Sequence, residues 1–241
     1  MLAVRLRHRS PVTDTPEKPD HDTEAPARLI PAERVAPTPV WAVGMAPTAP
    51  WQDLSGPRTV YETPWMKVTE HDVTAPTGAT SQYGVTRFQN LAVGVLPLHS
   101  DGTVTLVGQS RFALMNYSWE MPEGGAPFDE DPLEGARREL AEEAGLRADH
   151  WVEVLRMELS NSITDEQAIA WLAWDLTPVP TNPDPTEVMT VVRVPFVSLL
   201  HEIGRGAVRD AFTVATAFRA YHMAREGLLP GWLAHAMLTR V

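Results

Sequence analysis

Hydrophobic and polar residues show no regular period in the first 56 positions, and a regular alternation begins near residue 58. The first 57 residues also hold ten of the 22 prolines, which remove backbone donors and interrupt helices and strands. We therefore predict that residues 1–56 form a Pro-rich, mostly disordered or extended arm. The folded part of the chain is expected to begin at residue 57.

From residue 58 onward, short alternating segments are separated by turn residues, which is typical of β-strands. Strands are predicted within residues 59–75, 90–98, 103–112, 150–160, 166–177 and 188–196. The sequence His-Ser-Asp-Gly between the second and third of these is a hairpin-type connection. Helical spacing predicts one helix over 132–144, ending at Gly145, and two more in 197–227, broken at Gly204–Gly206. This order of elements predicts an α+β domain with mixed sheets between helices.

The composition narrows the classes of function. The 241 residues include no cysteine, which excludes disulfides, thiolate metal sites and cysteine nucleophiles. The formal net charge of −11 argues against binding to nucleic acid or to a membrane, because both reward basic surfaces. It does not exclude an anionic substrate, since a bound cation can invert the local charge. No apolar run approaches the roughly 20 residues that span a bilayer, and the first residues lack the apolar core of a secretory signal. A cytoplasmic protein is therefore expected.

The predicted helix over 132–144 is unusually acidic. Its hydrophobic residues recur at helical spacing and form one face for the core: Leu133, Ala136, Leu140 and Ala144. Glu139, Glu142 and Glu143 lie at i, i+3 and i+4, so their like charges meet on a neighbouring face. Arg138 can offset part of the repulsion through Glu134 or Glu142, four residues away on either side. A divalent cation would offset more, because Mg²⁺ prefers carboxylate oxygens. By charge alone, a solvated helix face is the commoner explanation.

The spacing of these residues changes that balance. Gly124, five residues, Glu130, seven residues and then Arg138-Glu139-Leu140-Ala141-Glu142-Glu143-Ala144-Gly145-Leu146 resembles the Nudix box, with all seven fixed identities present. Roughly residues 60–225 resemble the ADP-ribose pyrophosphatase branch of the Nudix hydrolase family. The resemblance implies a Nudix-type α/β/α sandwich with a mixed sheet over residues 57–226. Its N-terminal strands would occupy 57–90, and a C-terminal tail would follow at 227–241.

The resemblance also implies roles for the matching residues. Glu139 and Glu143 would be the principal metal ligands, with Glu142 as a further ligand or a carboxylate near the metal. The backbone carbonyl of Glu123 would complete the set of ligands. The remaining residues of the box would be structural, bracing the loop against the helix, allowing its close turn and ending the helix: Gly124, Glu130, Arg138 and Gly145.

Outside the box, the resemblance points to two further residues. Arg111 lies where relatives carry an arginine that faces substrate phosphate, although a surface arginine on a strand is the alternative. Glu187 lies in the loop where relatives place a glutamate general base, although an ordinary solvated acid is equally compatible. Asp165 and Glu166 are alternative acids in a nearby loop. The chain departs from the branch at Pro127, where relatives often carry an acid, and at Asp129, where they usually carry glycine.

The function implied by the resemblance is metal-dependent hydrolysis of a nucleoside diphosphate derivative. Mg²⁺ or Mn²⁺ would be the cofactor, Glu142 or Glu187 would activate water, and Arg111 would hold the diphosphate. ADP-ribose, cleaved to AMP and ribose 5-phosphate, is the leading substrate. The alternatives are a Nudix hydrolase of nucleotide sugars or dinucleotide cofactors, and a non-catalytic nucleotide-sensing domain. A homodimer is expected, in which residues around 58–90 help to build the partner's substrate pocket.

Overall fold

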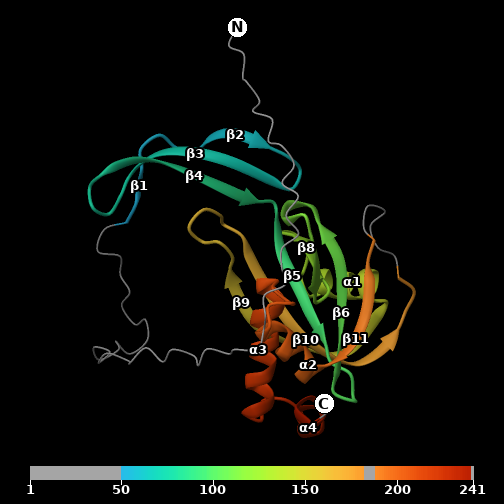
Figure 1. The fold of residues 1–241 in the computed structure, drawn as a ribbon. Helices are drawn as coiled ribbons and strands as arrows, with labels where there is room; N and C mark the ends of the chain where they lie inside the picture. Colours follow the sequence, from blue (N-terminus) through green and yellow to red (C-terminus); the bar gives the residue numbers. More distant parts are fainter. Residues whose placement is uncertain (1–49, 182–187, 240–241) are drawn as a thin grey trace, which may run out of the picture. The chain divides into compact units, whose positions relative to one another are not determined.

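A computed structural model of the chain describes residues 50–181 and 188–239, all of which belong to one compact unit of residues 48–241 (Figure 1). Residues 1–49, which make up most of the predicted arm, lie outside the described residues. The boundary at residue 56 therefore stays a prediction. Residues 52–53, inside the predicted arm, form the short strand β1.

The first four strands form an antiparallel sheet around β3. Strand β3 pairs along one edge with β1 and β2 and along the other with β4. The strands are β1 (Gln52–Asp53), β2 (Arg58–Glu62), β3 (Met66–Thr74) and β4 (Thr80–Phe88). The alternation that predicts strands within 59–75 is thus confirmed.

The other seven strands form two sheets, one of four strands and one of three. The first has the order β8-β5-β10-β9, and the pair β5–β10 is parallel while its other pairs are antiparallel. The second has the order β11-β6-β7. Their strands are β5 (Asn90–Pro97), β6 (Thr103–Arg111), β7 (Asn116–Glu120), β8 (Glu123–Pro127), β9 (Leu146–Glu158), β10 (Gln167–Pro178) and β11 (Thr190–Pro195). The predicted mixed sheet is confirmed.

The predicted hairpin between residues 90–98 and 103–112 is only partly present. The turn forms, with the His99 N–H donating to the Thr103 carbonyl at 2.9 Å, and one bridge joins Leu98 to Val104. Beyond that bridge, β5 and β6 belong to different sheets. The physical reason is that β5 already pairs on both edges, with β8 and with β10.

Helices cover the strands through two separate hydrophobic clusters. Helix α1 (Pro132–Ala144) contributes Ala136 and Leu140 to the smaller cluster, together with residues of β5 and β10. The larger cluster includes buried residues of the three C-terminal helices. These are α2 (Phe196–Gly204), α3 (Ala211–Arg225) and α4 (Gly231–Thr239). The strands thus carry a hydrophobic cluster on each face, and helices cover both clusters. This arrangement is the predicted α/β/α sandwich (Figure 1).

Helix α4 lies where the sequence indicates only a C-terminal tail, at 227–241. Leu233 and Met237, four residues apart on this helix, are fully buried against the larger cluster. The hydrophobic core therefore extends at least to Met237. None of the helices in the described ranges is both long enough and apolar enough to cross a bilayer.

Candidate active site

The loop before α1 and both ends of that helix are fixed by local hydrogen bonds. Strand β8 pairs with β5, which sets Glu123 opposite Gly94 and Gly124 opposite Val93. Asp131 caps α1 by accepting a hydrogen bond from the Leu133 N–H at 2.9 Å, and proline occupies the first helical position. Gly145 ends the helix with φ of 62°, which glycine adopts without strain. The helix thus begins and ends as its sequence predicts.

Three carboxylates of α1 line one cavity of about 650 Å³, together with Glu123 and Gly124. Glu139 and Glu143 are buried, with 9% and 5% of their surface exposed, and Glu142 is half-buried. Glu143 Oε2 accepts a hydrogen bond from the Glu123 N–H at 2.9 Å, which joins the helix to the start of the loop. The structure therefore brings together every residue that the sequence proposes as a metal ligand. Such a set of oxygen donors suits a hard divalent cation.

Arg138 joins the helix to the loop. Its guanidinium donates to the Gly125 carbonyl at 2.8 Å, and it contacts Glu130 at 3.3 Å, Glu139 at 2.7 Å and Glu142 at 3.3 Å. Burial by itself acts to lower the pKa of Arg138. The charge of Glu139 and the hydrogen bonds to Glu139 and Glu130 outweigh it, so the pKa is raised above its ordinary value. Arg138 thus stays charged and neutralises part of the acidic cluster.

Two contacts of the acidic helix go beyond what the sequence predicts: the ion pair of Glu134 and the close approach of Gly124 to Glu139. Glu134, one of the two partners expected for Arg138, forms its ion pair with Arg137 instead. Gly124 approaches Glu139 so closely that a Cβ added there would lie 2.3 Å from the Glu139 carboxyl carbon. The absence of a side chain at Gly124 therefore makes room for the Glu139 carboxylate.

Arg111, at the end of β6, lines the same cavity. Its Nε lies 3.0 and 3.1 Å from the two carboxylate oxygens of Glu120, and its Nη2 also donates to Glu120 Oε2. Glu123 Oε1 lies 3.6 Å from the same Nη2. Burial acts to lower the pKa of Arg111, and the hydrogen bond and charge of Glu120, helped by Glu123 and Glu143, outweigh it and raise the pKa. The guanidinium is held by protein carboxylates as well as facing the cavity.

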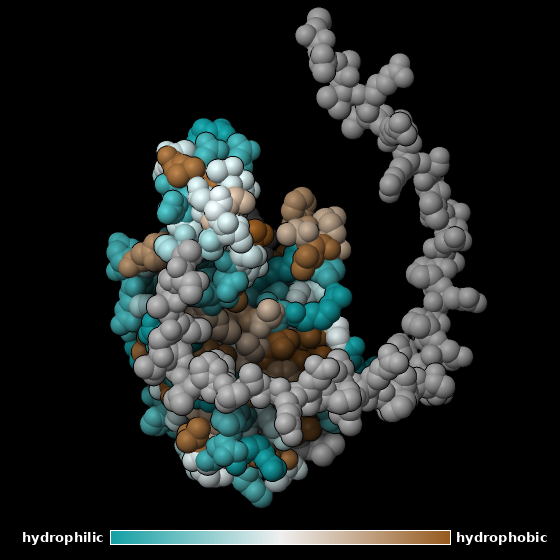
Figure 2. Space-filling view, turned by 90° about the vertical axis from the view of Figure 1, so that its left-hand side faces the viewer, coloured by the Kyte–Doolittle hydropathy of each residue, from teal (hydrophilic) through white to brown (hydrophobic). Residues whose placement is uncertain are grey.

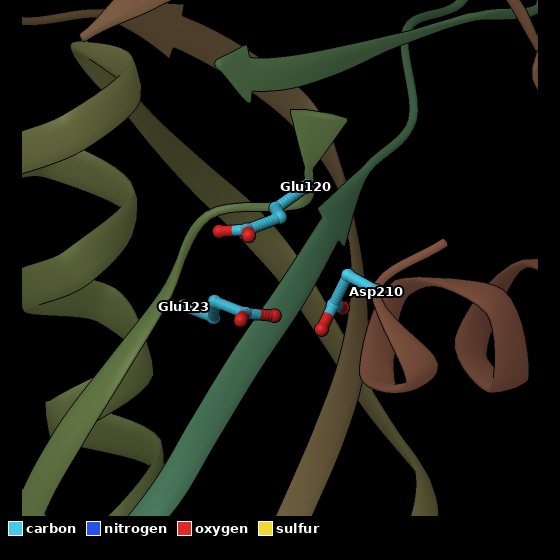
Figure 3. A group of neighbouring side chains, drawn as sticks. All are labelled: Glu120, Glu123 and Asp210. Atoms are coloured by element: carbon cyan, nitrogen blue, oxygen red, sulfur yellow. The ribbon is translucent and has the colours of Figure 1, made fainter. Parts of the chain in front are cut away.

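A second group of carboxylates lies beside Arg111. Figure 3 shows the side chains of Glu120, Glu123 and Asp210 pointing toward one another from β7, β8 and the residue before α3. Each offers an oxygen within 4.8 Å of the others. Asp210 also caps α3 by accepting from the Thr213 N–H at 2.6 Å. Within the described part of the chain, Glu123 Oε2 is buried and accepts no hydrogen bond. Burial first, and then the charges of Asp210 and Glu120, raise the pKa of Glu123 well above its ordinary value.

The remaining wall of the cavity includes a further acid and two aromatic residues. Glu166, one of the alternative acids, lines it, and burial raises the pKa of its carboxyl group. Asp165 instead contacts Arg87 at 3.1 Å and accepts a hydrogen bond from the Phe88 N–H. Trp65 and Phe88 also line the cavity, and Trp65 is 70% exposed. Glu187 lies outside the described residues.

Sequence reasoning did not single out the aromatic residues of the cavity, Trp65 and Phe88, or the acids beside Arg111, Glu120 and Asp210. Glu120 lies only three residues before Glu123, but in a strand pattern it looks like an ordinary surface acid. Asp210 lies 87 residues beyond Glu123 in the chain (210 − 123), so no local spacing links the two. A helix cap before Ala211 was the available signal for Asp210, and it indicates only a helix start.

Comparison with known protein families gives two matches. A model described as the NUDIX domain matches residues 89–212, just over half of the chain. A model described as the nucleoside diphosphate sugar hydrolase N-terminal domain matches residues 57–86. The first covers α1 and most of the residues that line the cavity, and the second covers Trp65 of the cavity and most of the β1–β4 sheet.

Individual proteins are similar to parts of the chain. An RNA pyrophosphohydrolase of Rhizobium meliloti is 44% identical over 61 residues, covering 23% of this chain and 36% of the relative. An ADP-ribose pyrophosphatase of Mycobacterium tuberculosis is 28% identical over 127 residues, covering 52% of this chain and 61% of the relative. The chain thus spans less than two thirds of either relative. A crystal structure of an ADP compounds hydrolase superposes with a TM-score of 0.60 at 19% identity, covering 73% of this chain and 98% of that one. This last likeness supports the fold alone.

Proposed function

The chain belongs to the NUDIX domain family, and we propose that it is a pyrophosphohydrolase that cleaves the diphosphate linkage of a nucleoside diphosphate joined to another moiety. The observation that carries this proposal is the group of carboxylates from Glu139, Glu142 and Glu143 in one cavity with Arg111. The cavity thus offers oxygen ligands for a cation and a guanidinium for phosphate.

A divalent cation, Mg²⁺ or Mn²⁺, fits the donors that the cavity provides. Glu139, Glu142 and Glu143 would hold it through carboxylate oxygens, and Glu123 through its backbone carbonyl. The space beside Gly124, which a Cβ would fill, leaves the Glu139 carboxylate room to serve as a ligand. When bound, the cation supplies positive charge that offsets the negative charge of the diphosphate.

The residues of the chain perform the other tasks of hydrolysis. The Arg111 guanidinium donates charge-assisted hydrogen bonds to a phosphate group. The carboxylate of Glu142 or Glu187 accepts a proton from water as the water oxygen attacks phosphorus. The bridging P–O bond then breaks, and the two products are phosphate monoesters. Glu130 and Arg138 keep the loop against α1 through the contacts described above.

ADP-ribose is the leading substrate, and nucleoside diphosphate sugars are the second candidate. The similarity to an ADP-ribose pyrophosphatase over 127 residues supports the first. The match of residues 57–86 to a nucleoside diphosphate sugar hydrolase N-terminal domain supports the second. Trp65, which is 70% exposed at the cavity, offers an aromatic face for a base in either case.

A substrate panel tests the proposed function. Purified protein is incubated with ADP-ribose, nucleotide sugars and dinucleotide cofactors, with Mg²⁺, with Mn²⁺ or with EDTA, and the products are separated by chromatography. We expect metal-dependent formation of nucleoside monophosphate from at least one compound. Binding of ADP-ribose without hydrolysis under all metal conditions would instead support a nucleotide-sensing domain.

We also propose that the protein is a homodimer. Large hydrophobic side chains are exposed on and beside the β1–β4 sheet: Trp51, Leu54, Val60, Tyr61 and Trp65. A second cavity of about 890 Å³, lined in part by Leu91, Phe128 and Met157, offers an apolar surface elsewhere on the molecule. Figure 2 shows hydrophobic patches between hydrophilic ones on one face of the molecule. Sedimentation equilibrium would contradict the dimer if the mass stayed that of one chain, 26.6 kDa, at micromolar concentration.

A further inference from the structure

The ion pair between Arg111 and Glu120 joins an arginine at the cavity to an almost fully buried carboxylate. Glu120 is 3% exposed, whereas 37% of the Arg111 side chain is exposed. Nε of Arg111 contacts both oxygens of Glu120, at 3.0 and 3.1 Å, and Nη2 contacts Oε2 as well. The carboxylate therefore binds one whole edge of the guanidinium.

The pairing of β6 with β7 brings the two residues to the same side. Arg111 lies opposite Asn116 in the antiparallel register, and Glu120 lies opposite Val107. Because side chains alternate along a strand, residues 116 and 120 point to the face that Arg111 also occupies. Arg111 thus extends along the strand pair until its guanidinium reaches Glu120.

When one edge of a guanidinium is bound, the direction of its remaining N–H donors is fixed as well. The group is planar and its five N–H donors have fixed relative directions. Within the described part of the chain, Nη1 of Arg111 donates no hydrogen bond, and Arg111 lines the cavity. We propose that Glu120 is a positioning residue that holds the Arg111 guanidinium so that its remaining donors face the diphosphate of the substrate. This inference rests on the proposed function.

The surroundings of Arg111 explain why such a restraint is needed. Glu123 Oε1 lies 3.6 Å from Nη2, and the negative charge of Glu143 also acts on the guanidinium. Both belong to the group of residues around the proposed cation. Without the Glu120 carboxylate, the guanidinium turns toward these acids and withdraws from the position that a phosphate occupies. Glu120 therefore acts on the substrate only through Arg111.

The test is a double-mutant cycle with Glu120→Gln and Arg111→Ala. Glu120→Gln keeps the side-chain volume but removes the charge and one acceptor. We expect kcat/KM to fall by about 10- to 100-fold, as it does when a partner that orients a metal ligand is removed. The loss should divide between KM and kcat in the same way as for Arg111→Ala. In the Arg111→Ala background, Glu120→Gln should change kcat/KM by less than about twofold.

A matched control separates this effect from general disturbance of the sheet. Asp101→Asn removes a carboxylate that pairs with Arg193 at 2.6 Å, near the opposite end of β6. It should leave kcat/KM unchanged. Equal fold losses from Glu120→Gln in both backgrounds would overturn the proposal, because a purely structural role adds to the loss of Arg111. If Glu120→Gln does not fold, Glu120→Asp, which keeps the charge but withdraws it by one methylene, is compared in the same two backgrounds.

Binding of ADP with Mg²⁺, measured by calorimetry, keeps this inference separate from the proposed function. If the wild-type protein binds ADP but hydrolyses nothing in the panel, the proposed function fails. The dissociation constant then reports on Glu120, and we expect it to rise with Glu120→Gln only when Arg111 is present. If the wild-type protein does not bind ADP at all, the positioning role is overturned too.

Discussion

Replacing Gly124 with alanine displaces one carboxylate of the proposed active site, the one on Glu139, by an amount that follows from the structure. Gly124 lies on β8 opposite Val93, and its α-carbon faces Glu139. An added Cβ would lie 2.3 Å from both Cδ and Oε1 of Glu139, and 2.6 Å from Oε2. The substitution removes no ionisable group. The three atoms nearest to the added Cβ all belong to the Glu139 carboxylate, so the substitution acts first on the position of Glu139.

The size of the effect follows from these distances. Ordinary contact between such atoms begins at 3.4 Å, so a group at 2.3 Å has to move by about 1.1 Å, the difference of the two. A misplacement of about 1 Å in a catalytic group can lower a rate about 100-fold. The free energy of unfolding should change by only about 1 kcal/mol, because the carboxylate ends a flexible side chain. We therefore expect a large loss of kcat with a nearly intact fold.

The assay measures kcat and the metal concentration at half-maximal rate, using the compound from the panel that the wild-type protein hydrolyses fastest. Gly84→Ala is a neutral control, because a Cβ there meets nothing within 4 Å. Gly125→Ala tests whether it matters where the extra methyl group lies, since its Cβ would meet the Asn90 amide nitrogen at 2.9 Å and not Glu139. If kcat of a normally folded Gly124→Ala variant stays within twofold of the wild-type value, turnover does not depend on the room that Gly124 leaves for the Glu139 carboxylate.

Other parts of the structure give three further predictions. Arg138→Ala should lower the free energy of unfolding in urea by about 1–3 kcal/mol, because the Gly125 carbonyl loses its donor. Leu233→Ala should lower it by about 2–5 kcal/mol, since Leu233 is fully buried. Burial and the nearby Arg193 charge lower the pKa of His99 from 6.5 to about 4. Between these two pH values, the unfolded chain binds a proton at His99 that the folded chain does not. Stability should therefore fall as the pH drops from 6.5 to 4, and less so in His99→Gln, as urea unfolding at several pH values will show.

The elements that the sequence predicts best are those whose signals are local. Helix α1 has its cap, its first-turn proline and its final glycine within 15 residues, from Asp131 to Gly145, and the structure begins and ends it there. The burial of Ala136 and Leu140 follows from the same spacing. The meeting of Glu139 and Glu143 also follows from it, because residues four apart share a helix face.

The features that the sequence does not predict depend on pairing between distant segments. The turn after β5 looks like that of a hairpin, but β8 and β10 take both edges of that strand, which no local pattern indicates. The meeting of Glu120 with Asp210 requires α3 to pack beside the loop, where Thr213 accepts the Met121 N–H at 2.9 Å. Leu233 and Met237 stand four residues apart in the sequence, but the sequence does not show the surface against which they pack, which is the larger cluster.

Hydrolysis by wild-type and Glu143→Gln proteins, measured with and without a divalent cation, shows whether turnover depends on a cation held by the acidic helix. Glutamine keeps an acceptor for the Glu123 N–H, which Glu143 Oε2 now binds at 2.9 Å, so the loop should stay in place. We expect cation-dependent cleavage of a nucleoside diphosphate derivative by the wild-type protein and loss of that cleavage in a folded Glu143→Gln variant. Near-normal turnover by the variant, or turnover that EDTA does not abolish, would contradict it.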